Sequence, residues 1–461
     1  MLLWFHIAEG KMLKELLKPE IQELLEQRRW GELREALSDW SAPEIAELLL
    51  DLGKQERVLL FRALPRWLSA EVFSYLDPAQ QDALLEELTD QETRELLRRL
   101  SPDDRTTLLE EMPAEVTRRL LALLDPEDFR ETSFLLGFPE QSVGRLMTPE
   151  FLALRPYWTV KEALDHIRRH GQDSETLNHL YVSDDEGHLL GEVALRTLVL
   201  SEEASVIADI MNYSVVSLSA FDDRESAVHA MQKYDLSVLP VVDSDGVLLG
   251  IVTFDDVMDV SEEEVTEDFQ KISAVAPIEI PYREASVVRL WRRRIGWLLL
   301  LLVSDFLTAT VIAAYEHAIQ GVIALAFFIP IIIGTGGNVA TQSATLIIRA
   351  LALREISTGD WLRVFLKELT VSVLLGVVLA LVVWLRGFFW RGGPEVALVV
   401  GLSMLFITVW SNAVAALLPL GARRIGIDPA LISGPFLTTF IDVTGLLIYF
   451  NVAELILELR G

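Results

Sequence analysis

Five long apolar segments lie in the C-terminal part of the chain, and they constrain its fold more than any other feature. They cover approximately residues 295–315, 319–348, 361–385, 396–418 and 430–457. Each is long enough to cross the hydrocarbon core of a bilayer, about 30 Å thick, which takes ~20 helical residues. Because backbone exposed to lipid must satisfy its own hydrogen bonds, we expect five membrane-spanning helices.

Basic residues at the ends of these segments predict their orientation. Arginines stand at three ends: Arg292, Arg293 and Arg294 before the first segment, Arg349 and Arg354 after the second, Arg423 and Arg424 after the fourth. Because Lys and Arg mark the cytoplasmic ends of spans, we expect the N-terminal half inside the cell and the C-terminus outside. Residues 1–11 lack a basic region and a cleavage site, so no signal peptide is predicted.

The charge of the chain is divided unevenly between its two parts. Residues 1–270 hold 56 Asp and Glu against 25 Lys and Arg, whereas residues 271–461 hold 12 against 15. Such acidity argues against nucleic-acid binding, which needs a basic surface. It can confer solubility alone, or it can bind divalent cations, which prefer oxygen ligands. With no cysteine, scattered histidines and no nucleophile–base arrangement, the chain is not expected to be an enzyme.

A short pattern recurs in the first 135 residues. Leu76-Asp77-Pro78, Leu100-Ser101-Pro102 and Leu124-Asp125-Pro126 are spaced 24 residues apart. Asp or Ser before Pro is typical of a helix N-cap followed by the first helical position. A repeat of this length indicates stacked helical hairpins, so we predict a helical-repeat N-domain over residues 1–135.

A second internal repeat occupies residues 144–260. Tyr181-Val182-Ser183-Asp184 parallels Val241-Val242-Asp243, and each copy predicts strand, helix, strand, turn, strand and helix. Pro240 interrupts the β-branched run of the second copy. Because proline cannot donate to a sheet ladder, it places that strand at a sheet edge or starts it at Val241. Residues 261–288 then follow as an acidic connecting helix, and residues 289–461 as the membrane domain.

Asp442 lies near the middle of the last apolar segment. An ionised carboxylate in hydrocarbon is costly, so it normally faces a polar cavity, a partner or an ion. A bond to Lys367 or an arginine is the alternative to a pore role. Asp305 and Glu368 are also in or near the membrane segments.

The second segment carries polar and small residues. Gly334-Thr335-Gly336-Gly337-Asn338 lacks the Gly-Lys-Ser/Thr ending of a phosphate loop, and we expect its small residues to allow close helix packing. The polar residues that follow are candidates for lining a pore or bonding between helices: Asn338, Thr341, Gln342 and Ser343.

The repeat over residues 144–260 resembles a tandem pair of CBS domains, which often bind adenine nucleotides. Gly250-Ile251-Val252-Thr253-Phe254-Asp255-Asp256 matches the family's nucleotide-binding stretch, and the resemblance implies that Thr253 and Asp256 face ribose and phosphate. The corresponding stretch of the first copy, residues 191–197, lacks both polar residues. A pair that forms a dimerisation platform without nucleotide is the alternative.

The order of these parts resembles the MgtE family of magnesium channels or transporters over essentially the whole chain. The most specific motifs are Gly334–Asn338 with Thr341–Leu346, and Asp442-Val443-Thr444-Gly445-Leu446-Leu447-Ile448-Tyr449. The resemblance implies a multidomain protein: an α-helical N-domain, an α/β CBS pair, a connecting plug helix and an all-α five-span domain. It also implies a homodimer in the cell (inner) membrane, with the pore at the subunit interface.

The resemblance assigns roles to residues of this chain. Asp442 would face a hydrated Mg²⁺ in the pore, Asp428 would lie near its cytoplasmic mouth, and Asn338, Gln342, Gly434 and Thr438 would line it. Cytosolic Mg²⁺ would close the pore by bridging acids: Glu71, Asp103, Asp223, Glu225, Asp235, Asp256, Asp259, Glu264, Glu267 and Asp268. ATP at the CBS pair is a further expected ligand.

Two residues depart from the family pattern. Gly434 stands before Pro435 where Asn is frequent, which bears on ion selectivity, and Thr107 stands at an N-domain position expected to be acidic. A broader divalent transporter for Mn²⁺ or Co²⁺ is one alternative function. A membrane-anchored CBS nucleotide sensor is another, and the residues do not distinguish a channel from a coupled carrier.

Overall fold

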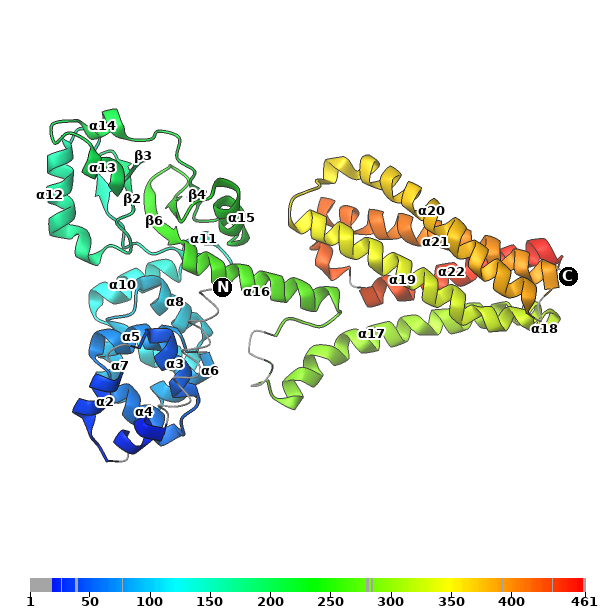
Figure 1. Ribbon diagram of the computed structural model, residues 1–461, viewed down its shortest axis with the longest axis horizontal. Helices are drawn as coiled ribbons and strands as arrows, with labels where there is room; N and C mark the ends of the chain where they lie inside the picture. Colours follow the sequence, from blue (N-terminus) through cyan, green and yellow to red (C-terminus); the bar gives the residue numbers. More distant parts are fainter. Residues whose placement is uncertain are drawn as a thin grey trace. The chain divides into compact units, whose positions relative to one another are not determined.

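The chain folds into two compact units, Met1–Glu262 and Glu263–Gly461, shown in the computed structural model of Figure 1. The structure describes residues 19–458, except 26, 38–39, 77, 279–281, 283–284, 391–392 and 433. Residues 1–11, for which no signal peptide is predicted, therefore lie outside the described residues.

The first part of the N-terminal unit is an array of short helices around a leucine-rich core. The helices are α2 (Trp30–Ala36), α3 (Ala42–Leu50), α4 (Lys54–Ala63), α5 (Arg66–Ser74), α6 (Pro78–Leu85), α7 (Asp90–Leu97), α8 (Pro102–Glu111), α9 (Ala114–Leu121) and α10 (Pro126–Leu135). Buried apolar residues from successive helices form one cluster that includes Leu49, Phe73, Leu97 and Leu109. Because α3 packs on α5, α5 on α7 and α8 on α10, the predicted stack of hairpins is confirmed.

The predicted helix caps are confirmed at two of the three repeats. Ser101 Oγ accepts a hydrogen bond from Asp104 N at 3.4 Å, and Asp125 Oδ1 accepts two from the first turn of α10. These side chains satisfy backbone N–H groups that have no partner within the helix. The third predicted cap, Asp77, lies outside the described residues, although α6 begins at Pro78 as expected.

The second part of this unit contains two small α/β halves with the predicted order of elements. The first half has α11 (Val143–Leu146), β1 (Ala153–Leu154), α12 (Val160–His170), η1 (Gly171–Asp173), β2 (His179–Ser183), β3 (Leu189–Ala194) and α13 (Leu195–Leu200). The second half has α14 (Ile207–Ile210), β4 (Leu218–Ser219), α15 (Glu225–Tyr234), β5 (Val238–Val242), β6 (Leu248–Thr253) and α16 (Phe254–Ile272).

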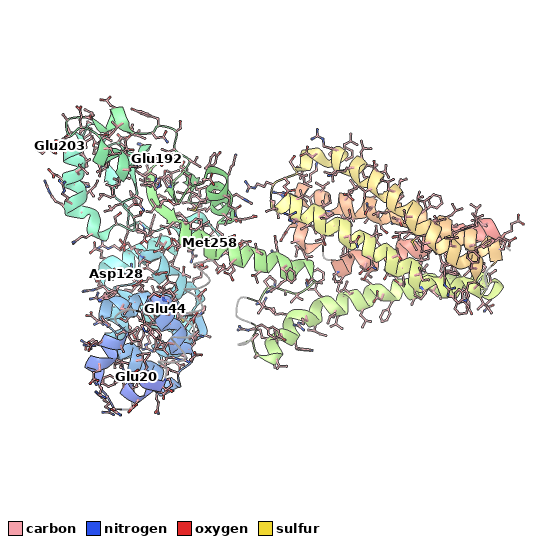
Figure 2. All side chains as sticks on the ribbon, viewed as in Figure 1. Glu20, Glu44, Asp128, Glu192, Glu203 and Met258 are labelled. Atoms are coloured by element: carbon pink, nitrogen blue, oxygen red, sulfur yellow. The ribbon has the colours of Figure 1, made fainter. Side chains whose placement is uncertain are left out.

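Each half holds a three-stranded sheet, in the orders β1-β2-β3 and β4-β5-β6. The central strand of each sheet pairs parallel to the first strand and antiparallel to the third. Glutamates and aspartates of this unit, such as Asp128, Glu192 and Glu203, are labelled in Figure 2.

Pro240 corrects the prediction that it marks a sheet edge or precedes the strand. It lies inside β5, which is the central strand, and pairs with Ile251 of β6. The two-residue β4 pairs only with Val241 and Val242, so β5 has a neighbour on one side alone at Pro240. The shortness of β4 therefore lets a central strand contain a residue that cannot donate to a ladder.

The acidic run, from Asp255 to Asp268, lies on one continuous helix. α16 extends over nineteen residues, from Phe254 to Ile272, and starts within the second α/β half. The connecting helix expected over 261–288 is helical only over 261–272, as the later part of α16. The prediction is wrong beyond Ile272, because the described residues between Ile272 and the start of α17 at Val287 are not helical.

The C-terminal unit is all-helical: α17 (Val287–Ala314), α18 (Glu316–Gly321), α19 (Ala324–Ala352), η2 (Thr358–Asp360), α20 (Trp361–Phe389), α21 (Gly393–Arg424), η3 (Pro429–Leu431) and α22 (Gly434–Leu457). Among the described residues, five helices are long and apolar enough to cross a membrane, which confirms the predicted number. α19, α21 and α22 pack on one another, and α20 packs on α21.

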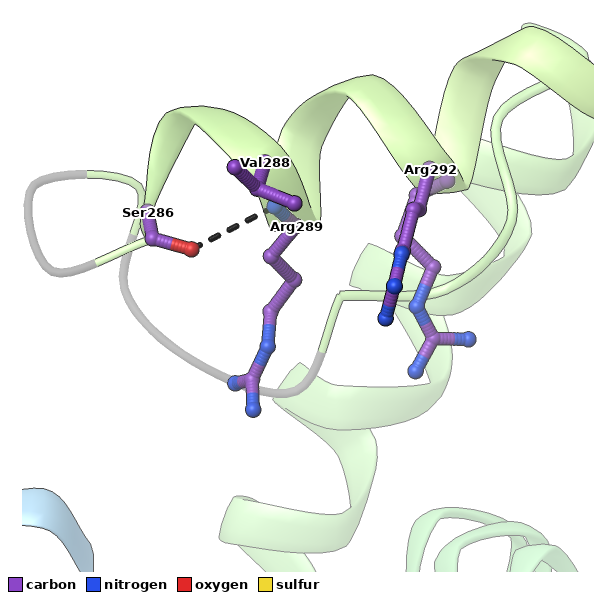
Figure 3. A pocket seen from close by; sticks show the side chains of 5 residues that line it. Ser286, Val288, Arg289 and Arg292 are labelled. Carbon is purple, nitrogen blue, oxygen red and sulfur yellow. Dashed lines mark hydrogen bonds between the residues drawn. The ribbon is translucent and has the colours of Figure 1, made fainter.

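α17 has no buried residue in the monomer, and it packs against α22. Ser286 caps its start by accepting a hydrogen bond from Arg289 N at 3.3 Å. Arg289, Arg292 and Arg293 line a shallow cavity of about 310 Å³ there (Figure 3). The basic residues expected at a cytoplasmic end therefore extend one turn further back along the helix than the Arg292–Arg294 triplet.

Two glycines of α19 allow close helix packing, as predicted. A Cβ at Gly336 would lie 2.9 Å from Ile407 Cγ2 of α21 and 3.0 Å from Ile441 Cγ2 of α22. A Cβ at Gly337 would lie 3.0 Å from Thr438 Cγ2. Gly334 has nothing within 4 Å of such an atom, so its lack of a side chain is not required by packing.

Candidate functional site

Asp442 projects from the middle of α22 and is half-buried in the monomer. No basic side chain pairs with it among the described residues of the membrane unit. The charged group that acts on it is another acid, Asp305 of α17. Among the described residues, the alternative bond from Asp442 to Lys367 or an arginine is therefore not formed.

The threonines around Asp442 are bonded to their own helix. Thr438 and Thr439 donate to Pro435 O at 2.9 and 3.0 Å, and Thr444 donates to Phe440 O at 2.9 Å. Thr444 Oγ1 also accepts from Trp410 Nε1 at 3.0 Å, which links α22 to α21. Satisfied hydroxyls such as these keep a polar surface in a span without breaking the helix.

The other predicted pore residues lie on α19 and α22. Asn338 and Gln342 are exposed in the monomer, one turn apart on α19. Gly434 and Thr438 are half-buried at the start of α22, where both face α19. A Cβ at Gly434 would lie 3.3 Å from Thr341 Cγ2, so an Asn in its place would press on α19.

Glu368 of α20 is bound inside the membrane unit. Its Oε2 accepts hydrogen bonds from Ser343 Oγ at 2.8 Å and Asn412 Nδ2 at 3.0 Å. Ser343 and Asn412 are 5% and 2% exposed, so both donors depend on this carboxylate. Ser343 therefore bonds between helices, as one of its two predicted roles required.

Asp428 and Glu267 share one basic partner. Lys271 Nζ lies 2.8 Å from Asp428 Oδ2 and 2.7 Å from Glu267 Oε1. Asp428 Oδ1 also accepts from Ala430 N at 2.8 Å and so caps η3. Burial alone would lower the pKa of Lys271, but the hydrogen bonds to these two carboxylates raise it. The two predicted ion ligands thus already hold an ammonium group, and Lys271 was not among the predicted site residues.

Three of the predicted sensor acids come together in the N-terminal unit. One of them, Asp103, lies at the start of α8, and the other two, Asp256 and Asp259, lie near the start of α16. Electrostatic interactions connect these acids with their neighbours Asp104 and Asp255. Asp103 is 8% exposed, and its Oδ1 is buried without a hydrogen-bond partner. We call Asp103, Asp104, Glu175, Asp255, Asp256 and Asp259 the carboxylate cluster.

The carboxylate cluster has strongly perturbed acid groups. Burial, with the neighbouring Asp103 carboxylate, raises the pKa of Asp104 to about 6 and that of Asp256 to about 8. Burial, then Asp103 and Asp255, raise the pKa of Glu175 to about 7. Burial also raises the pKa of Asp103, against the hydrogen bond from Ser101. Carboxyl groups that are crowded and buried favour their neutral form unless a cation is bound.

Asp104, Asp255 and Glu175 were not among the predicted sensor residues. Asp104 follows Asp103 directly and Asp255 belongs to the acidic run, so each carried a local signal. Glu175 follows η1 in the first α/β half, and nothing in its sequence neighbourhood sets it apart. Only the folded chain brings it within electrostatic range of the acids on α8 and α16.

The remaining predicted sensor residues lie elsewhere. Asp223 Oδ1 accepts from Glu225 N at 2.9 Å before α15, and Asp235 ends α15 in a left-handed conformation with φ of 52°. Glu71 is exposed on α5, while Glu264 and Asp268 lie on the later part of α16. Glu264 and Asp268 belong to the C-terminal unit, whereas the carboxylate cluster lies in the N-terminal unit.

The predicted nucleotide residues contact each other. Thr253 Oγ1 donates to Asp256 Oδ2 at 2.6 Å, and Thr253 is 7% exposed. Because Asp256 belongs to the carboxylate cluster, a phosphate beside it would meet several negative charges. The pair is better suited to a hydroxyl group or a cation than to a phosphate.

Comparison with known proteins identifies relatives for every part of this arrangement. The family model described as a divalent cation transporter matches residues 329–452, the MgtE intracellular N domain matches 40–141, and the CBS domain matches 143–201 and 207–263. The chain is 42% identical to the magnesium transporter MgtE of Thermus thermophilus, over 97% of this chain and 100% of that one. It is 34% identical to the magnesium transporter MgtE of Enterococcus faecalis, over 71% and 72%.

Two solved structures match the soluble half. The cytosolic domain of the Mg²⁺ channel MgtE in complex with ATP is 38% identical, with a TM-score of 0.51, over 53% of this chain and 100% of that chain. The soluble part of a magnesium transporter is 29% identical, with a TM-score of 0.52, over 54% and 99%.

The fold and these matches define a multi-pass membrane protein with N-terminal soluble domains, of a transporter family rather than an enzyme family. The chain belongs to the MgtE family of magnesium transporters. The family resemblance and the fold class expected from the sequence are both confirmed.

Proposed function

We propose that this protein carries Mg²⁺ across the cell (inner) membrane and that cytosolic Mg²⁺ closes its pathway. We assign this role to four parts: an N-domain (1–135), a CBS pair (144–260), a connecting segment (261–288) that begins with the end of α16, and a membrane domain (289–461). The observation that carries the proposal is an acid, Asp442, in the middle of a span without a basic partner among the described residues of its unit.

Asp442 is suited to a hydrated divalent cation. Mg²⁺ dehydrates reluctantly and is commonly held through its waters by one or two carboxylates. A carboxylate with no basic neighbour retains its attraction for such an ion. Asn338, Gln342, Gly434 and Thr438 offer amide, backbone and hydroxyl groups toward the same pathway, and Asp428 stands at its cytoplasmic mouth.

Two features of the membrane unit favour a homodimer as the form that carries Mg²⁺. Asn338 and Gln342 are exposed in the monomer although they lie on a membrane helix, and α17 buries no residue within the monomer. Polar side chains exposed on a span need a protein or water-filled surface opposite them. A second copy placed against α19 and α22 would supply that surface and would bring a second Asp442 to the pathway.

The carboxylate cluster is the proposed core of the Mg²⁺ sensor. Its residues fit the ion because Asp103 has a buried oxygen without a partner, and because its crowded carboxyl groups lack a basic neighbour among those that act on them. Asp103 and Asp256 would hold the ion, with Asp104, Asp255, Asp259 and Glu175 around them. Glu71, Asp223, Glu225, Asp235, Glu264, Glu267 and Asp268 are proposed ligands at other points.

The physical basis of closure is linkage. A cation that binds the closed arrangement more tightly than the open one shifts the population toward the closed arrangement. Without the ion, acids of the carboxylate cluster repel one another, so the arrangement that gathers them is disfavoured.

Nucleotide binding is a second proposed property of the CBS pair. It rests on the 38% identical cytosolic domain whose solved structure contains ATP. Thr253 and Asp256 remain the proposed contacts, with the ribose as the partner that fits their hydrogen-bonded pair best. Calorimetric titration of the full-length protein with ATP tests this property. Binding heat for the wild type, together with no heat above the dilution signal for Thr253→Val, would support Thr253 as a contact.

The transport proposal is tested with purified protein in liposomes, using Asp442→Asn and Asp442→Ala. Both variants should lose Mg²⁺ flux and keep the dimer of the wild type by light scattering. Normal flux in either variant would refute the role of Asp442. Competition by Mn²⁺ and Co²⁺ in the same assay separates a Mg²⁺-selective pathway from a broader divalent one, and flux with and without a membrane potential separates a channel from a coupled carrier.

The gating proposal is tested by neutralising the cytosolic acids. Asp256→Asn with Asp259→Asn should leave flux high when Mg²⁺ is abundant on the side of the soluble domains. Asp245→Asn in the exposed β5–β6 turn is the matched control and should be inhibited as the wild type is. Unchanged inhibition of the double variant would count against the carboxylate cluster as sensor.

A further inference from the structure

Lys271 links the C-terminal end of α16 to the loop before α22. Its Nζ lies 2.7 Å from Glu267 Oε1, one turn earlier on the same helix, and 2.8 Å from Asp428 Oδ2. Asp428 lies 157 residues later in the chain and caps η3 with its other oxygen. One ammonium group therefore joins two carboxylates that come from different elements of the membrane unit.

The packing around Lys271 shows how closely this helix end is docked. Ile272 packs against the buried cluster that includes Ala340 of α19 and Leu437 of α22. Its carbonyl oxygen lies 3.9 Å from where a Cβ at Gly434 would stand. Beyond the helix, Ala276 N donates to Arg293 O of α17 at 3.1 Å. The end of α16 thus lies beside the first turn of α22, where the proposed pathway begins.

The carboxylates of Glu267 and Asp428 need a cation to stay together. Side-chain exposures of 20% for Lys271, 24% for Glu267 and 37% for Asp428 leave this contact only partly screened by water. Two like charges at this separation repel, and a cation between them removes the repulsion. The Lys271 ammonium occupies the space between their oxygens, so a divalent ion shared by both carboxylates would have to displace it.

We propose that Lys271 is a positioning residue whose ammonium group serves as a built-in counter-cation at the Glu267–Asp428 pair. It holds the end of α16 against the start of α22 when no divalent cation is bound, and it moves out when Mg²⁺ takes the two carboxylates. This inference rests on the proposed gating by Mg²⁺ and adds a residue to it. Docking of α16 then has a basal level that does not depend on Mg²⁺.

The test combines flux with a distance measurement on full-length protein in liposomes. Spin labels at Phe269→Cys and Ile427→Cys report the docked distance, since both side chains are exposed and the chain has no other cysteine. Lys271→Met removes the charge and keeps much of the stem. Lys271→Arg keeps the charge, and Lys233→Met is the control, because Lys233 lies over the ring of Tyr234 on α15.

With Mg²⁺ chelated, Lys271→Met should lower the ratio of docked to undocked α16 roughly tenfold, equivalent to ~1.4 kcal/mol. Flux at zero Mg²⁺ should rise in the same variant. Saturating Mg²⁺ should restore the docked distance, because the ion replaces the ammonium group. Lys271→Arg and Lys233→Met should match the wild type under both conditions.

Two results would overturn the inference. One is a wild-type distance for Lys271→Met without Mg²⁺, which would make the contact incidental. The other is an undocked Lys271→Met at saturating Mg²⁺, which would mean that the ion does not replace the ammonium group. Failure of the proposed gating is distinguishable, because it would appear in the wild type as flux that Mg²⁺ does not inhibit, whatever Lys271→Met does at zero Mg²⁺.

Discussion

Asn412 of α21 donates hydrogen bonds to both the carboxylate and the backbone carbonyl of Glu368 on α20. Its Nδ2 lies 3.0 Å from Oε2 and 3.1 Å from O of Glu368. Ser343 of α19 donates to the same Oε2 at 2.8 Å, so one acid joins three membrane helices. In the absence of water, each of these donors would be costly without that carboxylate.

Replacing Glu368 should therefore destabilise the membrane unit. Glu368→Leu leaves the Ser343 and Asn412 donors without a partner, and we expect a loss of about 1–3 kcal/mol, the usual cost of a buried unsatisfied polar group. Glu368→Gln keeps one acceptor oxygen and should lose less. Thermal unfolding of the purified protein in detergent measures the effect. Glu395→Gln, on the exposed first turn of α21, is the control, and a Glu368→Leu variant as stable as this control would contradict the role of Glu368.

The glycines of α19 provide a matched pair of substitutions. Gly336→Ala places a methyl group 2.9 Å from Ile407 Cγ2 and 3.0 Å from Ile441 Cγ2, whereas Gly334→Ala meets nothing within 4 Å. We expect Gly336→Ala to lower stability by ~1–3 kcal/mol through overpacking. Gly334→Ala should be neutral or slightly stabilising, because Ala favours helix by about 1 kcal/mol over Gly. Equal unfolding temperatures for the two variants would argue against the close packing of α19, α21 and α22.

Binding of Mg²⁺ to the soluble domains should release protons. The pKa values of Asp104, Glu175 and Asp256 are raised to about 6, 7 and 8, so these carboxyl groups are partly protonated near neutral pH. A bound cation requires their ionised forms, so affinity should increase as pH rises from 6 to 8. Calorimetry in two buffers of different ionisation enthalpy counts the protons. Buffer-independent heats would show that the carboxylate cluster is not the binding site.

Without Mg²⁺, stability of the N-terminal unit should fall as pH rises. The folded-state pKa of Asp256, about 8, lies above the ordinary carboxyl value of 3.8, so the folded chain binds more protons between these values. Unfolding free energy then decreases with pH across that window. Denaturant unfolding of the full-length protein in chelator, followed by near-ultraviolet signals, measures the trend.

Asp256→Asn provides the corresponding mutational test. It removes an unfavourable buried charge and should increase stability in chelator at pH 8 by about 1 kcal/mol or more, since each pKa unit corresponds to 1.36 kcal/mol. The same variant should gain less from added Mg²⁺ than the wild type does. A variant that is destabilised in chelator and still gains the full Mg²⁺ effect would oppose both parts of this expectation.

Local patterns predicted much of the fold. Ser101 and Asp125 cap helices because the residues that they serve are two or three positions away, and the five spans form because each carries its own apolar run. The order of strands and helices in the α/β halves also followed from such patterns. Pro240 was misjudged because the length of β4, which decides its surroundings, is a property of the sheet rather than of the strand.

The sequence by itself determined the kinds of groups present: an acid in a span, acids before the membrane domain, and small residues where helices meet. Only the tertiary structure decided which of these groups lie close to one another in space. Glu175 lies within electrostatic range of Asp103 and Asp255, and Lys271 bonds to Asp428 across 157 residues. No periodicity in the sequence predicts either relation. The reason is physical: the pKa and the partners of a charged group depend on the groups that surround it in space, and segments distant in the sequence supply most of those groups.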